Sequence, residues 1–240
     1  MLKTENIYGF HAAILALNNL DRKIINWYCT KEVFERVKDK ISLRDLPECK
    51  ISERKKLDFK FKNNYHQGII VECTKLKQQN LNEALKEYNS TILILDSLTD
   101  SQNVGAIIRS AYLFGIKLVI YNENNSFDIN PALIKSAAGA YEKIKMIKVN
   151  NINNTISFLK EKGYWIIGLD AKSECDLSTI RKDIKKVIVL GSESKGIRKL
   201  IKSNCDYLIK IPMKNDSEFI DSLNVSNAAS IIFYSILKSS

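Results

Sequence analysis

The second half of the chain alternates between short apolar runs and longer stretches of helical periodicity. The apolar runs have strand length and lie at residues 91–95, 117–121, 144–149, 164–169, 186–190 and 207–211. Helical patterns separate them, notably at residues 104–114, from Pro131 onward, and at 223–237. Strands that alternate with helices predict an α/β domain with a parallel sheet covered on both faces. Ligands of such sheets bind at the carboxyl ends of the strands, so the loops there are the candidates for chemistry.

The first third of the chain shows a different pattern of predicted strands and helices. Strand-like runs at residues 24–29 and 68–73 alternate with helical stretches at 11–18 and 31–38. Residues 77–90 are polar and read as a linker joined to a short helix. The pattern therefore predicts a small N-terminal α/β domain at 1–76, a linker at 77–90 and a second domain at 91–240.

The charge of the chain favours a polyanionic partner. Lys and Arg number 37 against 27 Asp and Glu, which leaves a net charge of +10. Such a field attracts nucleic acid, although a lysine-rich bias of a whole proteome would produce the same excess. Basic and aromatic side chains that suit phosphate contacts and base stacking cluster in the N-terminal region, at Arg54, Lys55, Lys56, Phe59, Lys60, Phe61 and Lys62.

Several other classes of protein are disfavoured. The five cysteines are widely spaced without a C-x-x-C pair, which argues against a disulfide framework or zinc cluster and favours a reducing compartment. Only two histidines occur, so we expect no metal site. The apolar stretch near the start is interrupted by Glu5 and His11, and no run approaches the roughly 20 residues that span a bilayer. We expect a cytoplasmic protein that does not contact membranes.

The loop after the first strand of the second domain reads DSLTDSQNVGAIIRSA. Asn103 is a competent helix N-cap, and Arg109 follows inside an otherwise apolar helical run. An arginine buried there would need a phosphate or carboxylate partner. The alternative is an ordinary capped helix with Arg109 on its solvated face.

Two further loops carry candidate residues. Gly191 to Gly196 follow a buried strand and would let backbone groups face a small ligand, while Glu193 could pair with an arginine. An ordinary strand–helix turn is the alternative. Later, Pro212 ends a strand, and Ser222 is expected to cap the last helix. The polar residues of its first turn could be no more than caps.

Together the loops resemble the three motifs of the SpoU (TrmH/RlmB-like) family of RNA ribose 2′-O-methyltransferases, in the SPOUT superfamily. The matching residues are Asn103-x-Gly105-x-x-x-Arg109, Gly191-x-Glu193-x-x-Gly196, and Ile211-Pro212 followed by Ser222-Leu223-Asn224-Val225-Ser226. YGFHA near the start and HQGIIVE at 66–72 resemble the N-terminal substrate-binding domain of RlmB-type enzymes, which modify a guanosine of large-subunit ribosomal RNA.

The resemblance implies an architecture and a cofactor. It implies a trefoil knot near the C-terminus, an N-terminal RNA-binding domain, and a homodimer whose interface includes the last helix through Ala228, Ala229, Ile232 and Phe233. The implied cofactor is S-adenosylmethionine, held by Gly191, Gly196, Ile211, Ser222 and Leu223.

The resemblance also implies the reaction, which is methyl transfer to a ribose 2′-hydroxyl, most simply of a guanosine in large-subunit ribosomal RNA. Arg109 would hold the phosphate beside the target ribose. Asn103 and Glu193 would position Arg109 and the ribose, while Ser222 and Asn224 would shape the cofactor and acceptor sites. Two alternatives stay open: a transfer RNA ribose methyltransferase, and a non-catalytic RNA-binding ribosome-assembly protein on the same fold.

Overall fold

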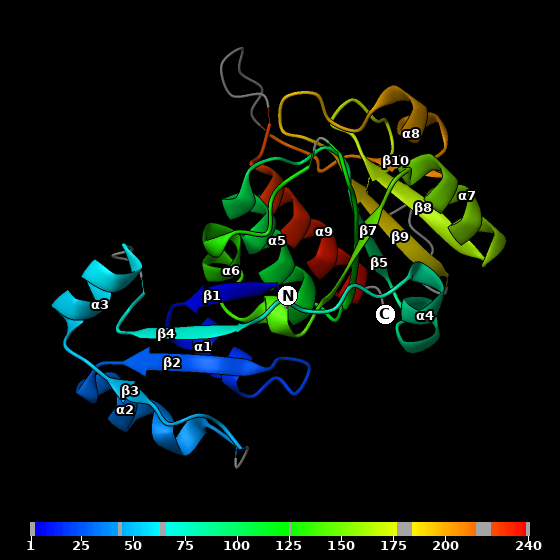
Figure 1. Cartoon of the computed structure of the whole chain (residues 1–240). Coiled ribbons are helices and arrows are strands. Elements are labelled where there is room, and N and C mark those ends of the chain that lie inside the picture. The colour runs from blue at the N-terminus through cyan, green and yellow to red at the C-terminus, as the bar shows by residue number, and fades with distance from the viewer. Residues whose placement is uncertain are drawn as a thin grey trace. The chain divides into compact units, whose positions relative to one another are not determined.

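The computed structural model describes residues 3–42, 45–62, 66–124, 126–176, 184–214 and 222–238. The chain divides into two units by its internal contacts (Figure 1). The first unit combines residues 1–77 with 129–143, and the second combines 78–128 with 144–240.

The second unit is built on a sheet of six parallel strands, ordered β10-β8-β9-β5-β6-β7. The parallel sheet expected from the sequence is confirmed. Its strands are β5 (Ile92–Leu95), β6 (Leu118–Asn122), β7 (Lys145–Val149), β8 (Tyr164–Leu169), β9 (Lys185–Leu190) and β10 (Tyr207–Ile209).

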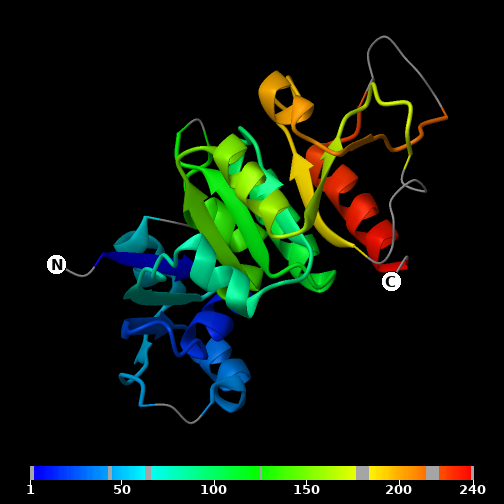
Figure 2. The same cartoon turned by 90° about the vertical axis from the view of Figure 1, so that its right-hand side faces the viewer.

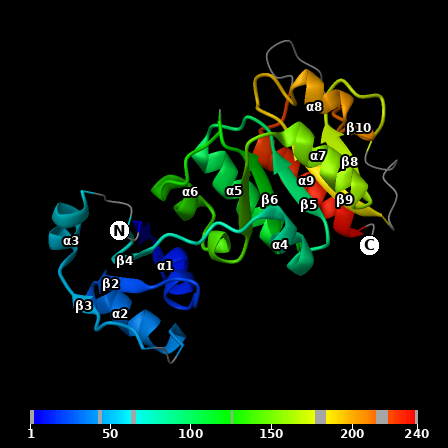
Figure 3. The ribbon, with the colours of Figure 1, turned by 45° about the vertical axis from the view of Figure 1, so that its right-hand side comes forward.

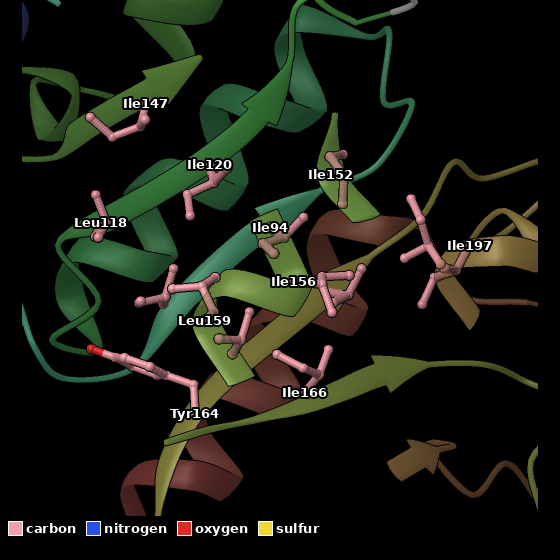
Figure 4. Packing of buried hydrophobic residues seen from close by; sticks show 14 of the residues in the cluster. Ile94, Leu118, Ile120, Ile147, Ile152, Ile156, Leu159, Tyr164, Ile166 and Ile197 are labelled. Carbon is pink, nitrogen blue, oxygen red and sulfur yellow. The ribbon is translucent and has the colours of Figure 1, made fainter. Parts of the chain in front are cut away.

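Helices cover this sheet on both faces because successive strand residues point to opposite sides. On one face, α4 (Leu81–Glu87), α7 (Ile152–Glu161) and α8 (Lys199–Ser203) close an apolar core (Figure 4). On the other face, α5 (Ser101–Leu113) and α9 (Val225–Lys238) run side by side (Figure 1) and are joined by a hydrogen bond of 2.8 Å between Ser110 and Ser230. Each buried aliphatic side chain here contributes about 1.5–3 kcal/mol.

The first unit contains a four-stranded sheet of order β1-β4-β2-β3 (Figure 2). Strand β4 (Ile69–Thr74) pairs antiparallel with β1 (Thr4–Tyr8) and β2 (Ile24–Cys29), whereas β3 (Lys50–Ile51) pairs parallel with β2. The helices of this stretch are α1 (Phe10–Leu17), α2 (Lys31–Val37), which a short 3-10 turn η1 (Lys38–Lys40) extends, and α3 (Arg54–Phe61), as Figure 3 shows.

The first unit also includes a distant segment of the chain, residues 129–143, with α6 (Pro131–Ser136) and the 3-10 turn η2 (Ala140–Glu142). Its Glu142 side chain is 1% exposed and forms a two-pronged ion pair with Arg22, whose side chain is fully buried; both N–O distances are 2.7 Å. Arg22 also contacts Glu5 at 2.7 Å. Burial alone would lower the pKa of Arg22, but the interactions with Glu142, Cys73 and Glu5 together outweigh it and raise that pKa above its ordinary value. The first unit is therefore held together by contacts more than a hundred residues apart in sequence.

Two predicted helix caps are wrong. Helix α5 begins at Ser101, and Asp100 caps it by accepting a 2.8 Å hydrogen bond from the backbone N–H of Gln102, so Asn103 lies inside the helix. Helix α9 begins three residues after Ser222. Asn224 is its cap, with Oδ1 accepting from the N–H of Ser226 at 2.9 Å. In each loop several polar residues could have capped the helix, and the sequence did not distinguish them.

The α9 residues that were expected at a dimer interface are buried within the chain itself. Ala228, Ala229, Ile232 and Phe233 are at most 5% exposed and belong to the core of their own chain. Among the described side chains of α9, the large apolar ones that are exposed are Ile231 and Tyr234. No helix in the described ranges is long and apolar enough to cross a membrane.

Candidate active site

A cavity lies at the carboxyl ends of β8, β9 and β10. It encloses about 650 Å³ including the space open to solvent. All five residues expected to bind the cofactor line it: Gly191, Gly196, Ile211, Ser222 and Leu223. Three loops far apart in the sequence thus converge on one pocket.

The loop after β9 requires glycine at two positions for steric and conformational reasons. Ser192 and Gly196 exchange backbone hydrogen bonds of 3.1 and 2.8 Å, which folds the loop back on itself. A Cβ at Gly191 would lie 2.1 Å from the carbonyl carbon of Gly196, so only glycine fits beneath the turn. Gly196 itself has φ +64°, a conformation that favours glycine.

A buried carboxylate fixes the far end of the same loop. Asp96, which follows β5, is fully buried and donates its backbone N–H to the carbonyl of Leu190 at 2.8 Å. Its carboxylate accepts from the N–H of Arg198 at 3.0 Å and from the guanidinium Nε at 2.7 Å. Sequence reasoning recognised Asp96 only as a strand end and missed Arg198. The available signal was a charged residue directly after a buried apolar strand.

Three of the four predicted catalytic residues form one hydrogen-bonded cluster. The amide Nδ2 of Asn103 donates to Oε1 of Glu193 at 2.8 Å. The amide Nδ2 of Asn224 lies 2.9 Å from the same Glu193 oxygen and 3.1 Å from Oδ1 of Asn103. Glu193 also lines the cavity, so the cluster stands at its wall. The expected pairing of Glu193 with an arginine is replaced by two amide donors.

Arg109 lies apart from this cluster. It follows Asn103 by six residues on α5, which places it about 9 Å along the axis and a third of a turn around the helix. Its side chain is exposed and has no ion pair or hydrogen bond to any described part of the chain. The prediction that burial forces a partner on Arg109 is therefore wrong, and its cationic group is available to a ligand.

Comparison with known proteins identifies the family. The model of the SpoU rRNA Methylase family matches residues 90–234. The chain belongs to this family. It is thus an RNA methyltransferase of the SpoU type. All three motifs lie inside the matched region, and the second and third of them line the cavity.

Individual SpoU relatives extend the likeness over almost the whole chain. The 23S rRNA (guanosine-2′-O-)-methyltransferase RlmB of Coxiella burnetii is 32% identical over 254 residues, covering 98% of this chain and 96% of the relative. An uncharacterised tRNA/rRNA methyltransferase of Borreliella burgdorferi is 38% identical over 192 residues, covering 75% and 82%.

A solved SpoU structure shares the fold. The methyltransferase AviRb of Streptomyces viridochromogenes, in complex with the cofactor AdoMet, superposes with a TM-score of 0.79 at 18% identity, covering 98% of this chain and 90% of that one. At this identity the likeness concerns the fold alone.

The SpoU cavity also contains residues that the sequence did not assign to the cofactor. They are mostly apolar and complete its walls: Leu169, Ala171, Met213, Val225 and Ala228. Nothing in a single sequence distinguishes such residues from ordinary core positions. Among the described residues, no group of three or more His, Cys, Asp or Glu side chains could hold a metal ion.

Proposed function

We propose that this chain transfers a methyl group from S-adenosylmethionine to the ribose 2′-hydroxyl of a guanosine in large-subunit ribosomal RNA. The observation that carries the proposal is the position of Glu193, which belongs both to the wall of the cavity and to the polar cluster with Asn103 and Asn224. Glu193 therefore connects the pocket for the methyl donor with the polar groups that can orient the acceptor. The near full-length similarity to RlmB supports the choice of substrate.

The cavity has the character that the methyl donor requires. Its apolar walls suit an adenine ring and the methylene groups of the methionine chain, and the folded-back loop at Gly191 leaves backbone groups facing the ligand because no Cβ fits there. When bound, S-adenosylmethionine supplies an electrophilic methyl carbon on a sulfonium. Gly191, Gly196, Ile211, Ser222 and Leu223 hold the donor. Orientation of two reactants can contribute about 7–11 kcal/mol.

The polar cluster orients the acceptor. The two amides that donate to one oxygen of Glu193 hold its carboxylate in a single position. Asn224 is itself fixed, because its Oδ1 accepts from the N–H and the hydroxyl of Ser226. We assign Asn103, Glu193 and Asn224 to positioning the ribose at the mouth of the cavity.

Arg109 binds the phosphate next to the target ribose. Its exposed guanidinium has the planar geometry that grips phosphate oxygens in pairs. A guanidinium offers five N–H donors and no acceptor, so we assign Arg109 an electrostatic role and not that of the proton acceptor.

The wider organisation follows the same proposal. We propose a C-terminal trefoil knot, supported by the convergence of the loops after β8, β9 and β10 with the start of α9 on one cavity. We propose a homodimer, supported by exposed apolar side chains on α5 and α9, including Leu113 and Tyr234. The N-terminal region serves as the RNA-binding domain, and the enzyme acts in the cytoplasm, where ribosomal RNA is modified.

Transfer RNA is the competing substrate. The relative from Borreliella burgdorferi is named for both RNA classes, so the similarity alone does not distinguish the two substrates. Mapping ribose methylation across ribosomal and transfer RNA, in cells with and without the gene, separates them. Loss of one 2′-O-methylguanosine in large-subunit RNA is the expected result, and a loss confined to transfer RNA would overturn the assignment.

A further inference from the structure

A second cavity, unlike the first, lies within the first unit. It is formed by the beginning of α2, the segment from β3 into α3, and the turn before β4. It is open and encloses about 1310 Å³ including the space open to solvent. Its charged lining residues are four cations and two carboxylates: Lys31, Arg36, Arg54, Lys56, Glu32 and Glu53.

The cations of this basic cavity are mostly free to bind a ligand. Lys31 and Arg54 make no ion pair or hydrogen bond through their side chains with the described residues. Lys56 approaches Glu53 only at 4.0 Å, and both side chains are more than 70% exposed, so this pair is weak. The cavity therefore presents a net positive surface that the protein itself does not neutralise.

One wall of the basic cavity is held in place. The guanidinium of Arg36 stacks over the ring of Phe10, 4.6 Å from its centre. The backbone N–H of Phe10 donates to Oε1 of Gln67 at 2.9 Å, and Gln67 lines the same cavity. Next to it, Gly68 has φ +80°, and a Cβ there would come within 2.9 Å of Val33. A fixed arginine loses less conformational entropy on binding.

Other basic residues of this region are engaged in packing. The ammonium of Lys60 lies 3.9 Å from the centre of the Tyr28 ring and donates to its hydroxyl at 2.7 Å. Phe61 packs edge-on against the same tyrosine. Of the basic and aromatic cluster at 54–62, Arg54 and Lys56 thus line the basic cavity, whereas the exposed Lys60 binds Tyr28 and Phe61 packs against the core.

We propose that the basic cavity binds the phosphodiester backbone of the RNA substrate. Phosphate oxygens suit it because arginine grips them in pairs, lysine binds them as a point charge, and an open polar groove tolerates a hydrated chain. Among its described lining residues, the cavity that takes the methyl donor has no lysine or arginine, so the two cavities suit different ligands. The inference rests on the proposed function, since it takes RNA as the substrate.

The test uses the full chain and large-subunit ribosomal RNA. Lys31→Glu combined with Arg54→Glu reverses two exposed, unpaired charges on the basic cavity. Lys23→Glu combined with Lys75→Glu makes the same change in net charge at exposed positions of the first unit outside it. RNA affinity is measured against salt for each, with S-adenosylmethionine affinity as the reference for an intact second unit.

The cavity variant should bind RNA at least tenfold more weakly than the control variant, with unchanged S-adenosylmethionine affinity. Its slope of log K against log salt should be shallower by about 0.7–0.9 for each phosphate that the variant no longer neutralises. Lys31→Gln with Arg54→Gln should show the same trend, which covers the case of a charge-reversed chain that fails to fold. Equal RNA affinity of the cavity and control variants would overturn the inference while wild-type methylation of RNA still stands. A wild-type chain that methylates no RNA would instead overturn the proposed function.

Discussion

At the scale of single residues, the proposed site depends on Asn224, whose side chain has two structural roles. Its Oδ1 caps α9, and its Nδ2 donates to Glu193 and Asn103. An aspartate would keep the cap and lose both donors. The two functions of this side chain can therefore be separated by one substitution.

Asn224→Asp should leave thermal stability almost unchanged and reduce methyl transfer roughly 10- to 150-fold. The estimate corresponds to losing a hydrogen bond to a charged group, about 1.5–3 kcal/mol, before the added repulsion from Glu193. Single-turnover rates measure the effect. Asn227→Asp, the same change at an exposed position of the same helix, is the control. Equal rates for the two variants would remove Asn224 from the site.

Arg109→Ala should reduce methyl transfer by a similar tenfold to hundredfold and leave S-adenosylmethionine affinity within about twofold, because Arg109 does not line the donor cavity. Turnover assays and calorimetric titration of the methyl donor measure the two effects. Lys117→Ala removes another exposed cation of the second unit and is the control. Near-normal turnover of Arg109→Ala, or a large loss of donor affinity, would contradict the assignment.

Motif residues were predictable singly, but their contacts were not. The sequence identified Asn103, Glu193 and Asn224 from three loops, and the structure joins them at 2.8–3.1 Å. It could not show that Asn103 binds Glu193 instead of capping α5, because Asp100, three residues earlier, is an equally good cap. The exposure of Arg109 was not predicted for a related reason: an apolar run in the sequence does not show which face of the helix packs against the rest of the protein.

At the scale of elements, the pairing of β2 with the very short β3 brings two cysteines together. The thiols of Cys29 and Cys49 lie close to each other, with a sulfur–sulfur distance of 3.2 Å. The hydrogen bond with Cys49 lowers the pKa of Cys29. Burial opposes this effect in Cys29 and is outweighed there, whereas it raises the pKa values of Cys73 and Cys205 to about 12.

Diamide should therefore oxidise Cys29 and Cys49 to a disulfide before it joins any other pair of thiols. The reagent takes up the two electrons and two protons that the thiols release. Because the thiolate is the nucleophile, the rate should rise with pH through the lowered pKa of Cys29, while Cys73 and Cys205 stay protonated. Mass spectrometry of unreduced peptides identifies the pair, with Cys29→Ser as control. A different dominant pair would contradict the pairing of β3 with β2.

The predicted strands and helices agree with the structure where the sequence pattern is unambiguous. Residues 24–29 and the helix start at Pro131 match β2 and α6, because apolar runs and a first-turn proline are strong local signals. Strand β1 and helix α3 were not anticipated. Strand β1 is short and half polar, and α3 has Leu57 as its single buried residue, so neither displays a clear periodicity.

At the scale of the whole molecule, the first unit depends on residues that the sequence placed elsewhere. Residues 129–143 lie between two strands of the second unit in sequence and yet belong to the first unit. No local pattern could reveal this, since the decisive contact joins residues 120 positions apart. Helix α4, from the segment expected as a linker, likewise packs its Ala84 into the core of the second unit.

Arg22→Met should destabilise the protein by about 3–5 kcal/mol, the usual cost of leaving a buried charge without its partner. The double variant Arg22→Met, Glu142→Met should be more stable than Arg22→Met alone, because it removes the stranded carboxylate of Glu142. Denaturant unfolding measures both. Lys38→Met, which removes an exposed ion pair with Glu35, should leave the midpoint nearly unchanged. A double variant less stable than Arg22→Met would contradict this reading.

The proposed reaction leaves a chemical mark on the RNA that can be read directly. The purified chain is incubated with large-subunit ribosomal RNA that lacks its natural modifications and with S-adenosylmethionine carrying an isotope-labelled methyl group. The RNA is then digested to nucleosides and analysed by mass spectrometry. We predict one labelled 2′-O-methylguanosine per RNA molecule, formed at least tenfold more slowly with Arg109→Ala. Label found on a base, or no label in any RNA despite tight binding of the methyl donor, would contradict the proposed reaction.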